Sequence, residues 1–458
     1  MPRTPRSLLI TAAAAACAGL CPGIAAASTA ATASATTAPH YVPGEVIVRY
    51  ADKADAATAE AIQDKTGTGD QDTFAPGAGV VQIEDGESVA ETVAELEQRP
   101  GVISASPNWI AYAAGFDFND PGRLKAPGGW KALQWNLLAG EGIDAPTAWE
   151  NVARAGRRGG SGVVVAVLDS GVAYRDKGPF RRSPDISPKR IVAGYDFVDD
   201  DPYPLDDNGH GTHVASTIVE SANNAIGVTG IAYRARVMPV RVLNNRGEGD
   251  SAAIAAGIRY AARRGAHVIN LSVEFDRSVR RTDIPDILAA LRYARRRGSL
   301  VIAASGNTGL KPVAYPARAG SVLSVGATTE HGCLADYSNR GTDLDIVAPG
   351  GGPDANLPKE RDRCRPLDPP GRDIYQMTFL RSIRSFGLPS GYNGTSMAAP
   401  HVSATAALVI ASGVLGADPT PRALEDHLKA TSTDLGPVGP DTLYGAGRVN
   451  AGAATTPR

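Results

Sequence analysis

Continuous apolar runs alternate with helix-like segments along most of the chain. The runs are "GVVVAVLDS" (162–170), "ARVMPVRVL" (235–243), "HVINLSV" (267–273), "LVIAASG" (300–306), "SVLSVGATT" and "LDIVAPG". Strands that are apolar at every position are covered on both faces, as in a parallel sheet between layers of helices. Helical patterns lie between or after the runs, at 251–265, 284–298, 395–413 and 421–432. Residues 130–455 are therefore predicted to form an α/β domain, a doubly wound, mostly parallel sheet with helices on both faces.

Polar residues stand where several of these strands end. Asp169 ends the first run, Ser272 lies near the end of the third, and Asn307 follows the fourth. Open α/β sheets carry their functional groups at the carboxyl ends of the strands. An acid directly after an apolar run is costly unless it has a partner. By itself, Asp169 is equally well explained as a loop acid or a helix N-cap.

Two further segments supply the partners that a serine nucleophile needs. His210 and His213 begin a helical stretch, and Ser396 begins another. A zinc site would favour a Glu between the two histidines and a third ligand, but Gly-Thr stands there. The alternative is a triad in which Asp169 orients His210 and His210 takes the proton of Ser396. The side-chain amide of Asn307 and the Ser396 N–H would then stabilise the oxyanion.

The segments "AVLDSGV", "NGHGTHVAS", "AASGN" and "YNGTSMAAPHV" resemble, in this order, the four signature segments of the subtilisin-like serine proteases. The Asp, His, Ser order is also that of this lineage. The resemblance covers 130–452 and implies a monomeric serine endopeptidase that acts on protein or peptide substrates without a catalytic cofactor. It assigns the triad and Asn307 as above, makes His213 structural, and leaves His401 buried and hydrogen-bonded.

The same resemblance implies the substrate-binding segments. Ser272 and Val273 match the edge strand that pairs with the substrate backbone. The opposite wall of S1, the pocket for the side chain before the scissile bond, is matched by Ala304, Ser305 and Gly306, and Ala314 matches a residue near its base. The family usually has Gly after "LSV", but this chain has Glu274. An acid at the rim of S1 argues against a purely apolar preference.

A structural calcium ion is expected from the resemblance alone. The segment "SANNAIGV" (221–228) resembles the family's calcium loop. Asn224 would offer its amide oxygen and Asp185 a carboxylate, and backbone carbonyls would come from Ala222, Ile226 and Val228. Calcium prefers such oxygen sets. An ordinary Asn-rich turn is the alternative.

A separate small unit is predicted over 39–115. Strand patterns at 42–50, 77–84 and 102–113 and helix patterns at 56–67 and 88–101 give the order β-α-β-α-β. Residues 36–112 carry 13 acidic and 4 basic side chains, whereas residues 113–458 carry a net positive charge. The unit resembles the family's inhibitor-type propeptide, a ferredoxin-like α+β fold that chaperones folding, covers the active site and is removed autocatalytically, here between 112 and 130. An independent acidic domain is the alternative.

Residues 1–35 have the features of a secretory signal peptide: Arg3 and Arg6, an apolar Ala-rich run and small residues at its end. A disordered Ala-rich tail is the alternative. No later run is long enough to span a membrane, and no anchor follows the C-terminal segment, so release into the medium is expected. A formal net charge of −2 argues against a nucleic-acid partner.

Two cysteines remain after removal of the signal, Cys333 and Cys364. Export into an oxidising compartment predicts a disulfide between them, with two free thiols as the alternative. The bond would tether the long Pro- and Gly-rich insertion at 351–391. A second insertion is expected at 173–187.

Two other classes of protein fit the sequence less well. A non-catalytic binding protein on the same fold would lack a triad member, and none is missing. A lipase or esterase would carry a nucleophile elbow, G-x-S-x-G, whereas this chain has G-T-S-M-A around Ser396. The sequence therefore favours a secreted endopeptidase.

Overall fold

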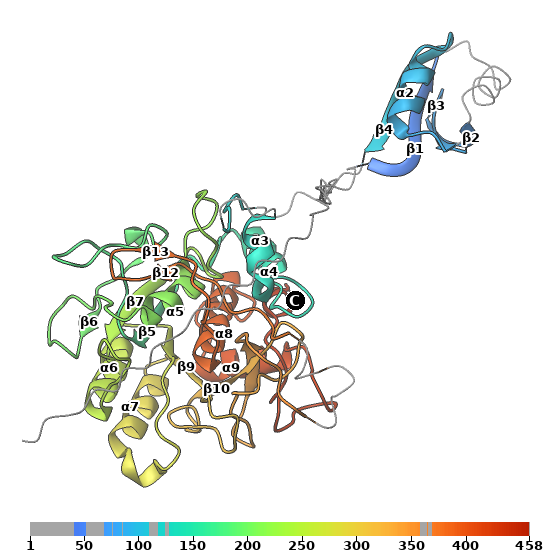
Figure 1. Ribbon diagram of the computed structural model, residues 1–458. Helices are drawn as coiled ribbons and strands as arrows, with labels where there is room; N and C mark the ends of the chain where they lie inside the picture. Colours follow the sequence, from blue (N-terminus) through green and yellow to red (C-terminus); the bar gives the residue numbers. More distant parts are fainter. Residues whose placement is uncertain are drawn as a thin grey trace, which may run out of the picture. The chain divides into compact units, whose positions relative to one another are not determined.

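The computed structural model describes residues 41–51, 68–75, 77–84, 86–109, 118–123, 128–357, 364 and 369–457. The chain divides into two compact units, Met1–Ala113 and Ala114–Arg458 (Figure 1). The expected signal peptide, the expected helix at 56–67 and part of the expected processing region lie outside the described residues.

The first unit contains an antiparallel four-stranded sheet with the order β2-β3-β1-β4. Its elements are β1 (Tyr41–Tyr50), β2 (Thr68–Ala75), β3 (Ala78–Ile83), α2 (Val89–Glu97) and β4 (Val102–Trp109). Val46 and Val48 alternate inward from β1 and pack with Val81 and Leu96 in a small core. The strand β2 was not predicted, because "TGDQDTFA" has no apolar alternation.

The second unit is built on a seven-stranded parallel sheet with the order β11-β10-β9-β8-β5-β7-β6. Its strands are β5 (Val164–Asp169), β6 (Tyr195–Asp196), β7 (Arg236–Arg241), β8 (Val268–Leu271), β9 (Leu300–Ala304), β10 (Leu323–Thr328) and β11 (Ile346–Pro349). A short antiparallel pair, β12 (Thr378–Phe379) and β13 (Phe386–Gly387), lies apart from it. The predicted α/β fold with a mostly parallel sheet is confirmed; the two-residue strand β6 was not predicted.

Helices cover both faces of this sheet (Figure 1). They are α3 (Gly129–Leu133), α4 (Ala145–Arg154), α5 (His210–Val219), α6 (Ser251–Arg263), α7 (Pro285–Arg296), α8 (Thr395–Ser412), α9 (Pro421–Ala430) and α10 (Ala451–Thr455), with 3₁₀ turns η1 (Trp135–Leu137), η2 (Pro188–Arg190) and η3 (Arg281–Asp283). Val165 and Val167 of β5 point into the core formed with α4, α5 and α8. Ala166 and Leu168 point into the core formed with α6 and α7. This is why β5 is apolar throughout.

The helix α8 is buried over almost its whole length. Every residue from Met397 to Ala411 is buried, and so is Thr395. A helix that is apolar on every side requires neighbours on every side. The helix contacts strands β8 to β11 and helices α4, α5 and α10. Ser396, near its start, keeps partial exposure.

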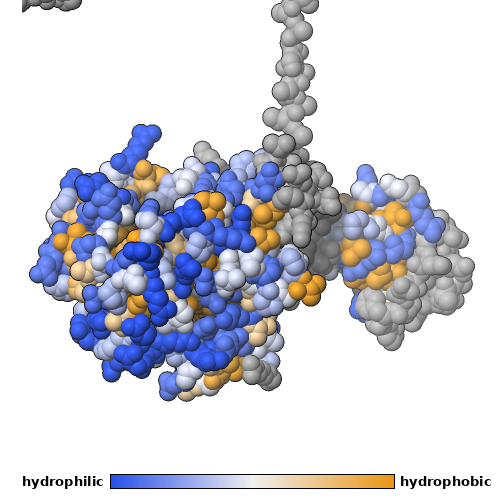
Figure 2. All heavy atoms as spheres, turned by 90° about the horizontal axis from the view of Figure 1, so that it is seen from below, coloured by the Kyte–Doolittle hydropathy of each residue, from blue (hydrophilic) through white to orange (hydrophobic). Residues whose placement is uncertain are grey.

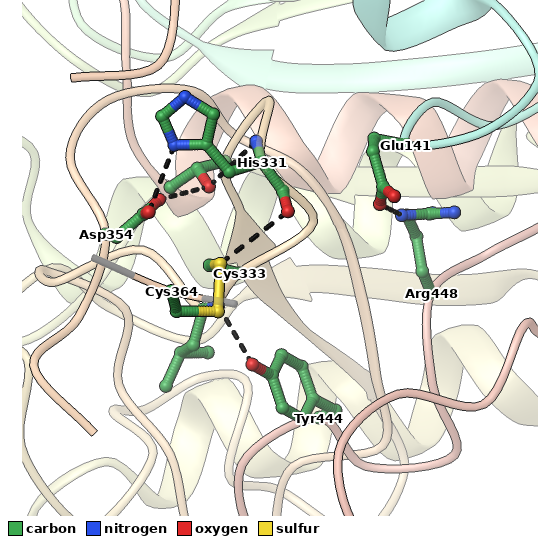
Figure 3. Close-up of a disulfide and its surroundings, with 9 residues drawn as sticks. Glu141, His331, Cys333, Asp354, Cys364, Tyr444 and Arg448 are labelled. Carbon is green, nitrogen blue, oxygen red and sulfur yellow. Dashed lines mark hydrogen bonds and ion pairs between the residues drawn. A yellow bond between two sulfur atoms is a disulfide. The ribbon is translucent and has the colours of Figure 1, made fainter. Parts of the chain in front are cut away.

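Cys333 and Cys364 form the expected disulfide, which closes a separation of 31 residues (Figure 3). Both cysteines are buried. His331, two residues before Cys333, pairs with Asp354 at 3.0 Å. The disulfide therefore ties the insertion after β11, which contains Cys364, to the turn after β10, which contains Cys333. Within the described ranges, none of the helices combines the length and apolarity that a bilayer crossing requires.

Candidate active site

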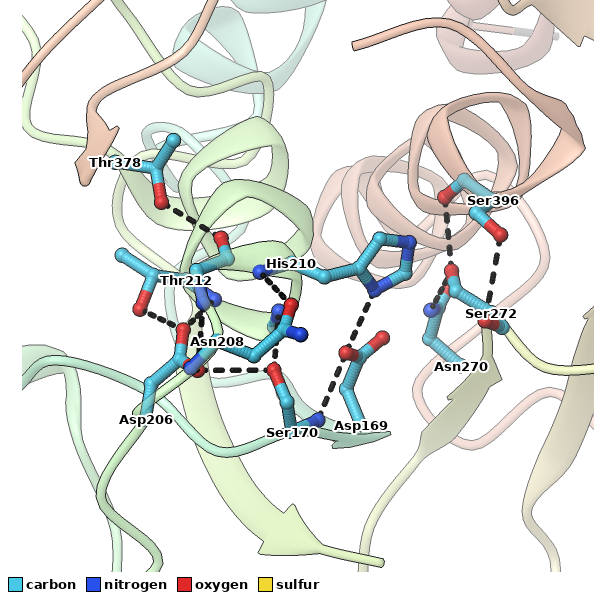
Figure 4. Close-up of polar contacts among 12 residues, drawn as sticks. Asp169, Ser170, Asp206, Asn208, His210, Thr212, Asn270, Ser272, Thr378 and Ser396 are labelled. Carbon is cyan, nitrogen blue, oxygen red and sulfur yellow. Dashed lines mark hydrogen bonds and ion pairs between the residues drawn. The ribbon is translucent and has the colours of Figure 1, made fainter. Parts of the chain in front are cut away.

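Asp169 and His210 meet at the carboxyl end of β5 (Figure 4). Asp169 is the last residue of the strand and is fully buried. Its Oδ1 accepts hydrogen bonds from His210 Nδ1, at 2.7 Å, and from the Ser170 N–H, at 2.8 Å. With Nδ1 donating to the carboxylate, Nε2 of His210 is left as the proton acceptor. The side chain of His210, the first residue of α5, is 26% exposed.

The pKa of His210 lies above its ordinary value. Burial works against the charged imidazolium, but the carboxylate of Asp169, its hydrogen bond and the charge of Asp206 outweigh this effect. The arrangement therefore stabilises an imidazolium at this position, which is what a general base needs after it has taken a proton.

Asp206 organises the loop that leads to His210. It is fully buried, and its Oδ1 accepts hydrogen bonds at 2.9 Å from Ser170 Oγ and from the N–H groups of Asn208 and Gly209. Its Oδ2 accepts from the N–H and the hydroxyl of Thr212, at 2.9 and 2.5 Å. Burial raises the pKa of Asp206, and these hydrogen bonds act in the opposite direction. Sequence analysis missed this residue.

A glycine lets α5 approach the end of β5 closely. A Cβ on Gly211 would lie 2.2 Å from the carbonyl oxygen of Gly171, so no other residue fits without displacing the backbone. The Gly211 N–H instead donates to Ser170 Oγ at 2.9 Å. The glycine after the histidine in "HGTH" is therefore a packing requirement that brings His210 to Asp169.

Ser396 is the second residue of α8 and is joined to Ser272, just after β8. Ser396 Oγ donates to the Ser272 carbonyl at 3.3 Å, and Ser272 Oγ donates to the Ser396 carbonyl at 2.8 Å. That carbonyl is available because Pro400, four residues later in the helix, has no N–H. The described residues show no hydrogen bond between Ser396 and His210 in this conformation, although both line the same cleft.

Asn307 is fixed by Thr395. Asn307 Oδ1 accepts hydrogen bonds from the N–H of Thr395, at 2.8 Å, and from its hydroxyl, at 2.9 Å. The amide nitrogen donates to Glu274 Oε1 at 3.3 Å. The N–H of Ser396 belongs to the first turn of α8, where backbone donors have no partner within the helix. Thr395, missed from sequence, thus positions the expected oxyanion amide.

The cleft has a volume of about 560 Å³. Of the predicted substrate-binding residues, four line it: Ser272, Val273, Glu274 and Ala304. The other three lie behind this wall. Ser305 donates its hydroxyl to the Asn339 carbonyl, its own carbonyl accepts the Ala314 N–H, and Gly306 is buried. Residues that sequence analysis did not assign extend the cleft, among them Leu243, Arg246, Glu248, Ile254 and Phe275.

Ser272 and Val273, which were predicted to pair with the substrate backbone, lie directly after β8. The strand β8 lies inside the sheet, between β5 and β9. Ser272 and Val273 follow its last paired residue, Leu271, so this short extension is open to a further strand.

The environments expected for His213 and His401 are confirmed. His213 bonds to the Ile374 carbonyl and stacks on Tyr392, and His401 bonds to the Met397 carbonyl. Burial lowers their pKa values to about 3 and about 4.

The expected calcium loop presents several oxygens. The carbonyls of Ala222, Ile226 and Val228 accept no hydrogen bond within the described ranges. Asp185 is fully buried, and its Oδ2 has no hydrogen-bond partner there. These groups fit an oxygen-preferring cation. Asn224 is turned differently from the expectation, because its amide nitrogen donates to Asp185 Oδ1 at 2.7 Å and its oxygen accepts the Ile226 N–H.

Two acids near this loop were missed by sequence analysis. Glu220 is fully buried and accepts the Met377 N–H, and burial raises the pKa of both Glu220 and Asp185. Asp120 accepts the N–H groups of Asn223 and Asn224 at 2.9 and 3.0 Å. The described residues contain no group of three or more His, Cys, Asp or Glu side chains arranged to hold a metal.

Comparisons with known proteins agree with this architecture. Residues 160–447 match the subtilase family, and residues 27–108 match the fervidolysin N-terminal prodomain. Subtilisin Savinase of Lederbergia lenta is 38% identical over 296 residues, which cover 65% of this chain and 91% of that protein. The thermophilic serine proteinase of Bacillus sp. (strain AK1) is 32% identical over 420 residues, covering 91% and 88%. A solved protease from Pseudoalteromonas arctica PAMC 21717 superposes with a TM-score of 0.57 at 29% identity, covering 74% of this chain and 98% of its own.

The chain belongs to the subtilase family of serine proteases. Within that class it is a serine endopeptidase that carries an N-terminal prodomain. Subtilisins work without a catalytic cofactor.

Proposed function

We propose that the protein is a secreted serine endopeptidase that hydrolyses peptide bonds through an Asp169–His210–Ser396 triad and an acyl-enzyme. The observation that carries the proposal is the 2.7 Å bond between buried Asp169 and the Nδ1 of His210, in the cleft that also contains Ser396. A buried carboxylate that fixes one ring nitrogen and leaves the other facing a serine is the arrangement that activates a hydroxyl nucleophile.

In the proposed reaction, Ser396 Oγ turns from the Ser272 carbonyl to His210 and attacks the scissile carbonyl carbon. Nε2 of His210 takes the hydroxyl proton, and Asp169 stabilises the resulting imidazolium. The amide nitrogen of Asn307 and the N–H of Ser396 donate to the oxyanion. His210 then gives its proton to the leaving amine. A water molecule, activated by the same ring nitrogen, hydrolyses the acyl-enzyme.

The substrate backbone would pair with the extension of β8 at Ser272 and Val273, which has no strand partner beyond Leu271 in the described part of the chain. Glu274 and Ala304 would line the entrance of S1, with Ser305, Gly306 and Ala314 forming its supporting wall and base. We expect the enzyme to act as a monomer on protein and peptide substrates.

We further propose that the protein is made as a zymogen, with a signal peptide at 1–35, an inhibitory and folding prodomain at 39–115 and a catalytic domain at 130–455. The match of residues 27–108 to a prodomain family supports the second assignment. The excess of acidic side chains in 36–112, against a net positive remainder, favours association of the two parts.

A structural calcium ion is proposed at the loop 221–228. Asp185 and the carbonyls of Ala222, Ile226 and Val228 would hold it, joined by Asn224 once its amide has turned. The ion would supply positive charge beside buried carboxyls and join the loop to the segment before it. Thermal unfolding of Ser396→Ala should then shift to lower temperature when calcium is removed with a chelator and recover when calcium is restored. Identical midpoints in chelator and in excess calcium would contradict the site.

The central experiment compares the intact masses of the secreted wild type and of Ser396→Ala. A wild type shortened by the signal and the prodomain, beside a variant that keeps the prodomain, would support Ser396 as the nucleophile of self-processing. Retention of the prodomain by both proteins, together with no hydrolysis of peptide substrates by the wild type, would refute the proposed activity.

A further inference from the structure

Glu274 connects the two walls of the cleft. It follows the extension of β8, and its carboxylate reaches the segment after β9. Oε2 of Glu274 accepts the Asn307 N–H at 3.1 Å, and Oε1 accepts the same N–H and the Asn307 side-chain amide, both at 3.3 Å. These distances are at the long end for N–H···O hydrogen bonds. The carboxylate is therefore held across the entrance of S1 by weak contacts.

The position of Gly306 shows how deeply the carboxylate reaches. A Cβ built on Gly306 would lie 2.4 Å from Glu274 Oε2, 2.3 Å from Asn339 Nδ2 and 3.0 Å from the Ala314 Cβ. The carboxylate thus lies against the S1 wall and close to the expected base. Asn339 Nδ2 is itself buried and has no hydrogen-bond partner among the described residues.

The carboxylate of Glu274 has no basic side chain as a partner among the described residues. No ion pair of Glu274 occurs within the part of the chain that the structure describes. Arg246, a cation that lines the same cleft, is paired with Glu248 at 2.7 Å. A carboxylate with only weak donors, at a site where a substrate side chain enters, is an acceptor for a cation.

We propose that Glu274 makes this protease select substrates with lysine or arginine immediately before the scissile bond. The inference rests on the proposed peptidase function of this cleft. A cationic side chain in S1 would form a charge-assisted hydrogen bond with Glu274 and draw its carboxylate away from Asn307. The amide of Asn307 would thereby become free for the oxyanion. With an apolar side chain in S1, the amide of Asn307 stays hydrogen-bonded to Glu274. An acidic side chain is repelled by the carboxylate of Glu274.

Because Glu274 acts both on binding and on the release of Asn307, its effect on cationic substrates should appear in kcat as well as in KM. A residue that only shaped the pocket would move KM for all substrates of similar size. Comparison of arginine with glutamine and of lysine with leucine separates charge from size.

The test uses one peptide series that differs only in the residue before the scissile bond: Arg, Lys, Gln, Leu, Phe and Glu. The mature wild type, Glu274→Gln and Asp276→Asn are compared. Asp276 is an exposed acid two residues away that does not line the cleft, so its variant makes the same change in charge. Active sites are counted with a fluorophosphonate reagent that labels the nucleophilic serine.

We expect the wild type to cleave after Arg and Lys at least about tenfold better, in kcat/KM, than after Gln and Leu, since a hydrogen bond to a charged group is worth at least this much. Glu274→Gln should lose most of this preference, and Asp276→Asn should keep it. A labelled, active enzyme that prefers Leu or Phe, with a ratio unchanged in Glu274→Gln, would overturn the inference and leave the peptidase proposal standing. A wild type that is neither labelled nor active would overturn both.

Discussion

Replacement of Asp206 by Asn tests whether this buried acid holds the catalytic loop. The carboxylate of Asp206 accepts two backbone N–H groups and one hydroxyl on Oδ1, and one backbone N–H and one hydroxyl on Oδ2. An amide has a single accepting oxygen. Whichever way it turns, its NH₂ group faces at least one buried backbone N–H. The less costly orientation leaves only the Thr212 N–H unpaired, since the Thr212 hydroxyl can rotate.

One unpaired buried donor costs about 1–3 kcal/mol, so Asp206→Asn should lower the free energy of unfolding by that amount. The variant should also change the pH profile. The charge of Asp206 contributes to the raised pKa of His210, and the proposed mechanism requires a neutral His210. Removal of that charge lowers the pKa, so the acid limb of kcat/KM should move to lower pH.

Unfolding is measured by denaturant titration in the Ser396→Ala background, which prevents self-digestion, and the pH profile is measured in the active enzyme. Thr212→Val is the matched control. It removes the hydroxyl bonded to Oδ2 but keeps the charge, so it should lower stability and leave the acid limb in place. An Asp206→Asn variant with unchanged stability, or with its acid limb at higher pH, would refute the reasoning.

Three further predictions follow from the site and the disulfide. Asn307→Ala should fold normally and lose about 3 kcal/mol of transition-state stabilisation, which lowers kcat; this magnitude is the one known for the oxyanion amide of subtilisin. A decrease in kcat of less than twofold would show that Asn307 does not belong to the oxyanion site. Wild-type kcat/KM should fall as pH decreases through the raised pKa of His210, and a flat profile from about pH 5 to 9 would contradict its role as base. Cys333→Ser combined with Cys364→Ser should reduce the unfolding free energy by about 2–4 kcal/mol in denaturant titration, whereas an unchanged value would show that the bond adds no stability.

The fold of the second unit was largely predictable because its strands are apolar on both faces. The run before Asp169 gave the strand and placed the acid at its end, and the structure has both. The strand β2 and the two-residue strand β6 were not predictable in this way. Each is defined by backbone pairing with a neighbour, β3 or β7, and its own side chains carry no periodic signal.

The residues that support the site were harder to predict than those expected to do chemistry. Asp206 reaches Ser170 across 36 positions, and Thr395 reaches Asn307 across 88. Such pairs are tertiary contacts between segments that lie far apart in the sequence, and a single sequence does not show which segments come into contact. The orientation of Asn224 was not predictable for a related reason, since the buried carboxyl of Asp185 decides which end of the amide faces it.

The proposed nucleophile Ser396 lies on α8, so we expect catalysis to persist for as long as the core of the domain stays folded. A helix buried on every side opens only when the domain opens, so its amides should exchange with solvent last of all. Cuts made by other proteases fall on exposed loops, which do not hold Ser396 in place. A preparation that is nicked but still folded should therefore remain active, and loss of activity should report global unfolding rather than local damage.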